Sequence, residues 1–347
     1  TVATGLLCGT ILTVMNTPAD IYEGAYWYIF IIFMGIPATF LYNLLAAIIR
    51  SLGDSKTPVY FLAMSSVLNI GLDLAFILVF RLGVAGASLA TVLSQGVSGL
   101  ACLVYMVKKF PILHVSREER QLAIRSCRAL CFMGVPMGLQ YSITAIGSIF
   151  LQSAVNSLGS LYVAGVAAGS KLFQLLGCPY DAMGATMATY CGQNVGAVKL
   201  DRLGKGVRAC SLLGLIYALI AFGGMLLFAP QGAMLFLDPT EPELATLVDL
   251  TAQYIRTLTA FFFPLALVNI VRFSIQGMGF SGLAILAGVM EMIARTAVGV
   301  IFVPMFGYTA ACFASPAAWV CADLFLIPAC MGSINRLRKI YEIEPEA

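Results

Sequence analysis

The sequence has few charged residues and almost no histidine. Only 11% of its 347 residues are charged, whereas 60% are hydrophobic. Soluble domains contain roughly 25% charged residues and about 45–50% apolar residues. A soluble globular domain is therefore excluded, and the composition indicates a polytopic membrane protein. Basic residues are not interleaved with aromatic residues on one face, so we expect no nucleic-acid partner.

The residue patterns of metal sites and hydrolases are also missing. The ten cysteines form no Cys-x-x-Cys pair, and the single histidine, His114, cannot build a site that needs several imidazoles. The sequence contains no His-Glu-x-x-His motif, no Gly-x-Ser-x-Gly motif and no histidine within an apolar run. We therefore expect neither a bound metal nor enzyme activity, and we interpret most cysteines as small packing residues.

Long apolar stretches dominate the chain. A membrane core of about 30 Å requires about 20 mostly apolar residues in a helix. By this measure the sequence predicts an all-α membrane protein with ten spans, at residues 1–15, 24–50, 58–80, 83–107, 129–155, 161–191, 206–229, 246–277, 282–304 and 308–334. Four prolines within these spans are candidate kinks: Pro37, Pro136, Pro179 and Pro264.

Basic residues occur in every second connection. The connections after the second, fourth and sixth spans are basic, as is the C-terminal tail, and the alternate connections are short or acidic. Arg81 is the one clear exception. Because cytoplasmic loops are enriched in lysine and arginine, this pattern predicts a cytoplasmic C-terminus. It also favours the inner membrane of a bacterium.

The longest basic connection, residues 108–128, divides the predicted spans into four and six. We expect an N-terminal lobe at residues 1–107 and a C-terminal lobe with a cytoplasmic tail at residues 129–347. Apolar side chains at Leu122, Ile124 and Leu130 follow a charged stretch at 117–120, which indicates an amphipathic helix on the inner membrane surface. A solvated linker is an equally good interpretation.

Two regions of the chain carry the same features at matched spacing. Residues 50–55, Arg-Ser-Leu-Gly-Asp-Ser, correspond to residues 276–281, Gln-Gly-Met-Gly-Phe-Ser, and a proline precedes each of them. Spans two to four thus match spans eight to ten, which is typical of a duplicated transporter architecture. Because spans five and six have no partner, we expect two further helices upstream of Thr1. Both halves then share one orientation, so the repeat is parallel.

Several short motifs occur in a characteristic order. They lie at residues 50–54 (Arg-Ser-Leu-Gly-Asp), 69–73 (Asn-Ile-Gly-Leu-Asp), 83–87 (Gly-Val-Ala-Gly-Ala), 134–136 (Gly-Val-Pro) and 192–197 (Gly-Gln-Asn-Val-Gly-Ala). Together they resemble the multidrug and toxic compound extrusion (MATE) family over nearly the whole chain. The resemblance implies an exporter of twelve helices in two six-helix lobes, of which this sequence lacks the first two helices.

The resemblance also implies cation coupling, in which Na⁺ or H⁺ is exchanged for organic, often cationic, drugs. Some members of the family carry a glutamate in span five and an aspartate in span eight as cation ligands. This chain has Thr144 and the neighbourhood of Leu265 at the corresponding places, which argues against sodium coupling through the second lobe. Other members use an aspartate on the first helix, which the sequence does not contain.

Ionisable residues within a membrane are costly and mark candidate functional sites. Glu291 and Arg295 lie four residues apart on one face of the ninth span and can form an ion pair. They are either a cation-responsive pair that faces a cavity or a structural bridge. Asn69 and Asp73, also four apart, occupy the corresponding place in the first copy, which favours an architectural role shared by both lobes.

Other polar residues in the spans have two interpretations each. Gln140, Thr144 and Gln152 form a polar stripe on the fifth span, and such residues either line a substrate pathway or join helices by hydrogen bonds. Lys171 could bind a carbonyl group or an acid on a neighbouring helix. Arg272 is expected to extend towards the cytoplasmic surface.

The sequence therefore predicts a cation-coupled antiporter that exports drugs or xenobiotics by alternating access of two lobes. The alternatives are a lipid-linked oligosaccharide flippase of related fold and, remotely, a membrane-embedded enzyme. A flippase would favour a cleft rich in arginine and lysine, because its substrates carry pyrophosphate. The expected partners are a small organic substrate and membrane lipid, the expected oligomeric state is a monomer, and the coupling ion, H⁺ or Na⁺, takes the place of a cofactor.

Overall fold

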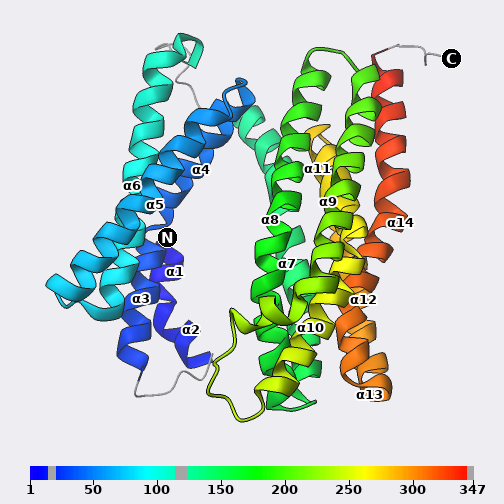
Figure 1. Ribbon diagram of the computed structural model, residues 1–347. Helices are drawn as coiled ribbons and strands as arrows, with labels where there is room; N and C mark the ends of the chain where they lie inside the picture. The colour runs from blue at the N-terminus through cyan, green and yellow to red at the C-terminus, as the bar shows by residue number, and fades with distance from the viewer. Residues whose placement is uncertain (15–20, 114–122, 342–347) are drawn as a thin grey trace. The chain divides into compact units, whose positions relative to one another are not determined.

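The computed structural model describes residues 1–14, 21–113 and 123–341, and these residues form helices without any β-strand. Their contacts divide the chain into two compact units, Thr1–Gln121 and Leu122–Ala347. Both units are drawn in Figure 1, and each is described by itself. The predicted all-α architecture is confirmed.

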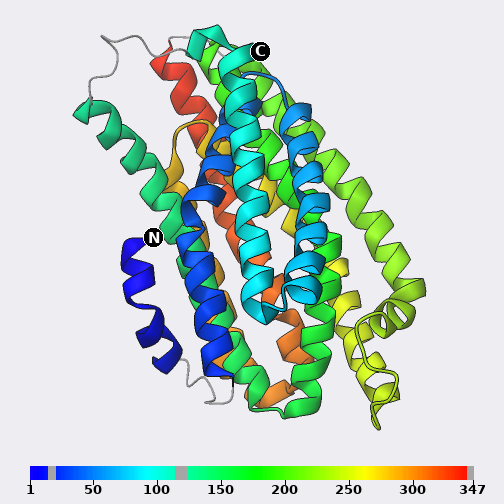
Figure 2. The ribbon, with the colours of Figure 1, turned by 90° about the vertical axis from the view of Figure 1, so that its left-hand side faces the viewer.

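The first unit is built around one long helix, α6. This helix packs against α3, α4 and α5, and Figure 2 shows it between the other long helices of the unit. The core consists of Tyr42, Leu45, Ala46, Ile49 and Cys102. The elements of the unit are α1 (Val2–Leu6), α2 (Cys8–Val14), α3 (Tyr22–Met34), α4 (Ile36–Ser51), α5 (Lys56–Leu74), the π-helix η1 (Ala75–Val79), α6 (Gly83–Lys109) and the 3₁₀-helix η2 (Pro111–Leu113).

The second unit has a larger core, and its most enclosed helix is α11. This helix packs against α8, α9 and α14, while α12 packs against α7 and α14. The elements are α7 (Ile124–Asn156), α8 (Ser160–Gly196), α9 (Asp201–Met234), α10 (Leu244–Ala260), α11 (Phe262–Gly277), α12 (Ser281–Ala297), the π-helix η3 (Val298–Phe302), α13 (Val303–Phe306) and α14 (Tyr308–Ile340).

The number of spans differs from the prediction at one place. Among the described residues seven helices are long and apolar enough to cross a membrane, and the count reaches nine if each bent helix pair is one span. The first predicted span, residues 1–15, forms the short helices α1 and α2, which are interrupted at Leu7. The described part of the chain thus gives seven to nine candidate spans where ten were predicted, and the break at Leu7 is one that composition alone does not reveal.

The predicted connection at 108–128 is helical at both ends. Helix α6 continues to Lys109, and α7 begins at Ile124 within the predicted connection. Its middle, residues 114–122, carries most of the predicted amphipathic segment and His114 and lies outside the described residues.

The sequence repeat extends to unusual features of the backbone. Helices α3 and α4 meet at an angle of 41°, and α10 and α11 meet at 51°. Each bend is followed closely by a proline, Pro37 or Pro264, as expected for a residue without an N–H group. The glycine after each bent pair has a positive φ, 93° at Gly53 and 90° at Gly279. A π-helix then follows in each copy, η1 or η3.

The other two candidate kinks lie inside continuous helices. Pro136 is within α7 and Pro179 within α8. A proline leaves a carbonyl group one turn earlier without its helical donor. Near Pro179 the hydroxyl group of Tyr217 donates to the carbonyl oxygen of Leu176 at 2.9 Å. This hydrogen bond connects α8 to α9 at the carbonyl group next to that of Leu175, the one that Pro179 leaves without a helical donor.

The close contact between α8 and α11 depends on Gly277. A Cβ atom at this position would lie 2.9 Å from the Cα atom of Ala188 and would also meet the Ala188 carbonyl oxygen. Backbone atoms cannot rotate away as a flexible side chain can, so the two helices would have to separate. Residue 277 must therefore remain a glycine for α11 to stay enclosed.

We expect Gly277→Ala to lower the free energy of unfolding by about 1–3 kcal/mol, the usual cost of overpacking a close contact. Thermal unfolding of the purified protein in detergent measures the effect. Gly223→Ala is the matched control, because a Cβ atom there meets nothing within 4 Å. An equal melting temperature for the two variants would contradict the packing argument.

Asp54 fixes the connection between α4 and α5, outside the spans. Its carboxylate accepts hydrogen bonds from the Tyr105 hydroxyl at 2.6 Å, from the Thr57 hydroxyl at 2.7 Å and from the Thr57 and Lys56 backbone N–H groups at 3.0 and 3.2 Å. These donors stabilise the ionised form, Tyr105 most strongly, and lower the pKa of Asp54 to about 2.

Because the folded pKa is depressed, Asp54 contributes stability that is complete above its unfolded pKa of about 3.9 and is lost as the pH falls through about 2. The difference in melting temperature between the native protein and Asp54→Asn should be constant above about pH 4 and should shrink towards pH 2. Tyr105→Phe should move this loss to higher pH. A difference that grows on acidification would refute the assignment.

Candidate functional site

Helix α11 carries polar residues on one face although the helix is almost wholly enclosed. Asn269, Arg272 and Gln276 follow one another at spacings of three and four residues, so they lie on the same side of the helix. Arg272 is 7% exposed and Gln276 is 6% exposed. A polar stripe inside an apolar unit must find its partners within that unit.

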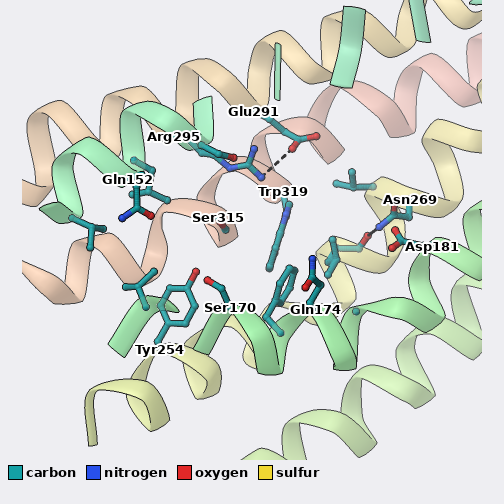
Figure 3. Close-up of a pocket in the computed structure, with 18 of the residues that line it drawn as sticks. Gln152, Ser170, Gln174, Asp181, Tyr254, Asn269, Glu291, Arg295, Ser315 and Trp319 are labelled. Atoms are coloured by element: carbon teal, nitrogen blue, oxygen red, sulfur yellow. Dashed lines mark hydrogen bonds and ion pairs between the residues drawn. The ribbon is translucent and has the colours of Figure 1, made fainter. Parts of the chain in front are cut away.

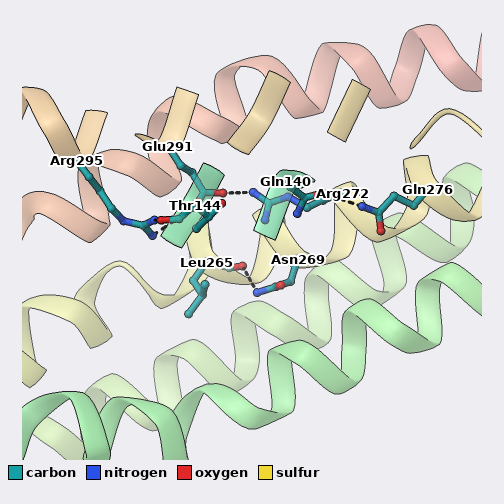
Figure 4. A network of polar contacts seen from close by, with 8 residues as sticks. All are labelled: Gln140, Thr144, Leu265, Asn269, Arg272, Gln276, Glu291 and Arg295. Carbon is teal, nitrogen blue, oxygen red and sulfur yellow. Dashed lines mark hydrogen bonds and ion pairs between the residues drawn. The ribbon is translucent and has the colours of Figure 1, made fainter. Parts of the chain in front are cut away.

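The centre of this polar region is an ion cluster of two arginines and one glutamate. Glu291 on α12 forms ion pairs with Arg272 on α11 and with Arg295 one turn further along α12, the latter at 3.2 Å (Figure 4). Glu291 is 3% exposed and Arg295 is 7% exposed. The predicted pairing of Glu291 with Arg295 is present. The expectation that Arg272 extends to the cytoplasmic surface is wrong, because its guanidinium group turns inward to Glu291.

The polar network continues from the ion cluster onto α7. The Gln276 amide donates to the Gln140 side-chain oxygen at 2.9 Å, and Arg295 donates to the Thr144 carbonyl oxygen at 3.5 Å. Both glutamines are buried. Gly288 on α12 allows the close approach, since a Cβ atom there would lie 3.2 Å from the Gln140 side chain. The Gln140 side chain therefore joins helices, whereas Thr144 contributes only its backbone carbonyl group, and its buried hydroxyl group has no hydrogen-bond partner among the described residues.

A cavity of about 410 Å³ lies beside the ion cluster, within the second unit. Arg272, Glu291 and Arg295 form part of its wall. Figure 3 shows Glu291 and Arg295 across the cavity from Ser170 and Gln174 of α8 and from Tyr254 of α10. Its polar and aromatic lining also includes Ser148, Gln152, Phe173, Asp181, Asn269, Ser315 and Trp319. The cavity is large enough for a small organic molecule.

Two other predicted candidates in the second unit, Gln152 and Lys171, differ in whether they line the cavity. Gln152 lines the cavity and donates to the Asn156 side-chain oxygen at 2.8 Å. Lys171 on α8 is exposed and is not part of the cavity wall. Within the polar stripe of the fifth predicted span, the Gln140 side chain thus joins helices and the Gln152 side chain lines the cavity.

The remaining candidates, Asn69 and Asp73, lie on α5 in the first unit. Both are partly buried, and the Asn69 amide nitrogen and one Asp73 carboxylate oxygen have no hydrogen-bond partner among the described residues. Glu291 and Arg295, in contrast, are paired and buried. Among the described residues the two pairs therefore have different environments.

Sequence reasoning missed Arg272 as a member of the site. The available signal was its spacing, since it lies three residues after Asn269 and four before Gln276 on one helical face. Reasoning from its place near the end of the predicted span gave the opposite orientation. As for metals, no group of three or more potential ligands among His, Cys, Asp and Glu occurs in the part of the chain that the structure describes.

The fold and the site define a polytopic helical membrane protein with a polar cavity inside one of its units. The family model described as MatE matches residues 1–75 and 136–305, which is more than half of the chain. The chain therefore belongs to the MatE family, as the sequence resemblance implied.

Curated relatives agree with this assignment. The chain is 37% identical over 190 residues to "Probable multidrug resistance protein YpnP" of Bacillus subtilis, an alignment that covers 54% of this chain and 41% of that protein. It is 24% identical over 254 residues to the "FAD transporter" of Shewanella oneidensis, covering 71% of this chain and 53% of that protein. The chain thus spans about half the length of these relatives. The family and the relatives indicate a transporter and not an enzyme.

Solved structures share the fold. A crystal structure titled "Crystal structure of MATE in complex with MaL6" superposes with a TM-score of 0.90 at 21% sequence identity and covers 97% of this chain and 76% of that chain. At this identity the likeness concerns the fold alone.

Removal of Glu291 should destabilise the second unit more than removal of Arg295. Glu291→Gln leaves two buried guanidinium groups without a counter-ion, and breaking a buried pair costs about 3–5 kcal/mol. Arg295→Gln leaves Arg272 and Glu291 as a neutral pair, so its cost should be smaller. Thermal unfolding in detergent compares the two variants. The charge assignment would be wrong if Arg295→Gln were as destabilising as Glu291→Gln.

Proposed function

We propose that the protein exports small organic drugs or xenobiotics across a membrane by alternating access of its two units. The observation that supports this most directly is the cavity of about 410 Å³ inside a membrane-spanning unit, lined by both polar and aromatic side chains. Such a mixed lining suits drug-sized ligands. The names of its multidrug resistance relatives agree with this proposal.

The same volume favours a drug over a lipid-linked oligosaccharide, which is several times larger than a drug-sized ligand. Two arginines do line the cavity, and an arginine-rich cleft would suit pyrophosphate. They share the carboxylate of Glu291, however, so the cluster offers one net positive charge, which is less than a pyrophosphate with two or more negative charges requires. We therefore keep the flippase as the second candidate and the exporter as the first.

We further propose that export is driven by exchange for H⁺ or Na⁺ and that Asp73 is the coupling carboxylate within this chain. Glu291 is poorly suited to that role because each of its carboxylate oxygens already pairs with a guanidinium group. Asp73 and Asn69, one turn apart on α5, each have one polar side-chain atom without a hydrogen-bond partner among the described residues. An unpartnered carboxylate within a membrane span is free to bind a cation or proton and is costly without such a role.

Further proposals concern location and assembly. The alternation of basic connections supports a bacterial inner membrane with a cytoplasmic C-terminus. The protein would act as a monomer surrounded by lipid, with a small organic molecule as its substrate and no nucleic acid or cofactor beyond the coupling ion.

The test uses the complete gene expressed in a bacterial strain that lacks its own efflux pumps. We expect energised cells to accumulate less of a fluorescent organic dye than cells with the empty vector, and an ionophore that collapses the cation gradients should abolish the difference. Asp73→Asn should remove gradient-driven efflux, because an amide cannot take up and release a cation as a carboxylate does.

The control variant is Glu241→Gln, which changes an exposed acid in the connection before α10. It should export dye at the native rate. Equal dye accumulation with and without the native gene would contradict the exporter, whereas native efflux by Asp73→Asn would contradict only the assignment of the coupling residue.

A further inference from the structure

The ion cluster of the second unit is not balanced in charge. Arg272 and Arg295 share a single carboxylate, that of Glu291, so the three side chains carry one net positive charge. All three are less than 10% exposed. A buried net charge in a membrane-spanning unit is unfavourable unless a further negative group approaches it.

Two further carboxyl groups, on α14 and α8, form no ion pair with the guanidinium groups of the cluster. Asp323 on α14 is 7% exposed and interacts electrostatically with Arg272 and Glu291. Asp181 on α8 lines the cavity but is exposed. Neither forms an ion pair with a residue that the structure describes, and one Asp323 oxygen has no hydrogen-bond partner there. The described ion pairs therefore provide one carboxylate for two guanidinium groups.

The cavity wall offers an unused donor next to this charge. The Nε–H group of Arg272 is buried and has no acceptor among the described residues, although the side chain lines the cavity. Gln174 and Asn269 add amide groups to the same wall, and Tyr254 and Ser170 add hydroxyl groups (Figure 3). A ligand that supplies acceptor oxygens would satisfy the Nε–H group of Arg272.

An aromatic surface completes the cavity. The rings of Phe173 and Trp319 both line it, and they stack with their centroids 5.8 Å apart and their planes at 16°. Flat rings held in place in this way favour a flat aromatic ligand through stacking. The cavity thus combines an aromatic wall with a positively charged wall.

We propose that this cavity binds an aromatic organic anion. The anionic group lies against Arg272 and Arg295, and the aromatic body lies along Phe173 and Trp319. Without a ligand, both guanidinium groups pair with Glu291. When the ligand binds, its anionic oxygens replace some of these contacts. The inference deepens the proposed export function by naming the substrate class of the cavity, and it rests on that function only for its transport role.

Trp319 provides a direct readout. The chain contains two tryptophans, so Trp27→Phe leaves Trp319 as the only one. Nitroaromatic compounds quench tryptophan fluorescence, and we would titrate this variant in detergent with 4-nitrobenzoate, 4-nitrobenzamide and 4-nitrobenzylammonium. These probes share one ring and differ in charge. We expect saturable quenching by the anion, with a dissociation constant at least 10-fold below those of the amide and the ammonium compound.

Substitutions then locate the anionic group. Arg295→Gln should raise the dissociation constant of 4-nitrobenzoate at least 10-fold and leave that of 4-nitrobenzamide unchanged. Lys171→Gln, which removes an exposed positive charge outside the cavity wall, should change neither.

The proposal would be overturned by equal or tighter binding of the amide or ammonium compound, by quenching that does not saturate, or by unchanged anion binding in Arg295→Gln. The assay measures binding without a gradient or transport. If the protein binds the anion but shows no efflux, the exporter is contradicted and the binding site stands. If it exports dye but does not bind the anion, only the binding site is contradicted.

Discussion

The structure of the second unit depends on one buried electrostatic interaction, the contact of Arg272 and Arg295 with Glu291. It connects α11 to α12, and all three side chains are less than 10% exposed. From this cluster the polar network reaches α7 through Gln140 and Thr144. The same cluster borders the cavity, so the residues that hold three helices together also set the charge of the proposed binding site.

The bends and glycines of the unit can be understood from this constraint. A helix that carries Asn269, Arg272 and Gln276 on one face must bring that face inward. The 51° bend between α10 and α11 and the close contact at Gly277 place α11 deep among its neighbours. Arg256 of α10 also joins two helices, because its guanidinium group donates to the carbonyl oxygens of Met225 and Leu226 in α9. Pro230 has no N–H group to offer to Leu226 one turn earlier.

The sequence predicted those features that depend on one helix at a time. Apolar length defined nearly all the spans, and a spacing of four residues was enough to pair Glu291 with Arg295. The repeated motifs predicted a duplication that the structure extends to paired bends, positive-φ glycines and π-helices. What it did not predict depends on how a helix is rotated against its neighbours. Arg272 is the clearest case, since position along the span suggested the surface while the polar face of α11 pointed inward. The break at Leu7 is another, because a short interruption leaves composition unchanged.

The account makes the ion cluster a binding surface as well as a structural one. A structure determined with 4-bromobenzoate bound would test this most directly, because anomalous scattering locates the bromine independently of the protein. We predict a bromine peak beside Phe173 and Trp319, carboxylate oxygens at Arg272 and Arg295, and a Glu291 side chain that has moved away from at least one of them. A cavity without bromine, with Glu291 still bound to both arginines, would contradict the account.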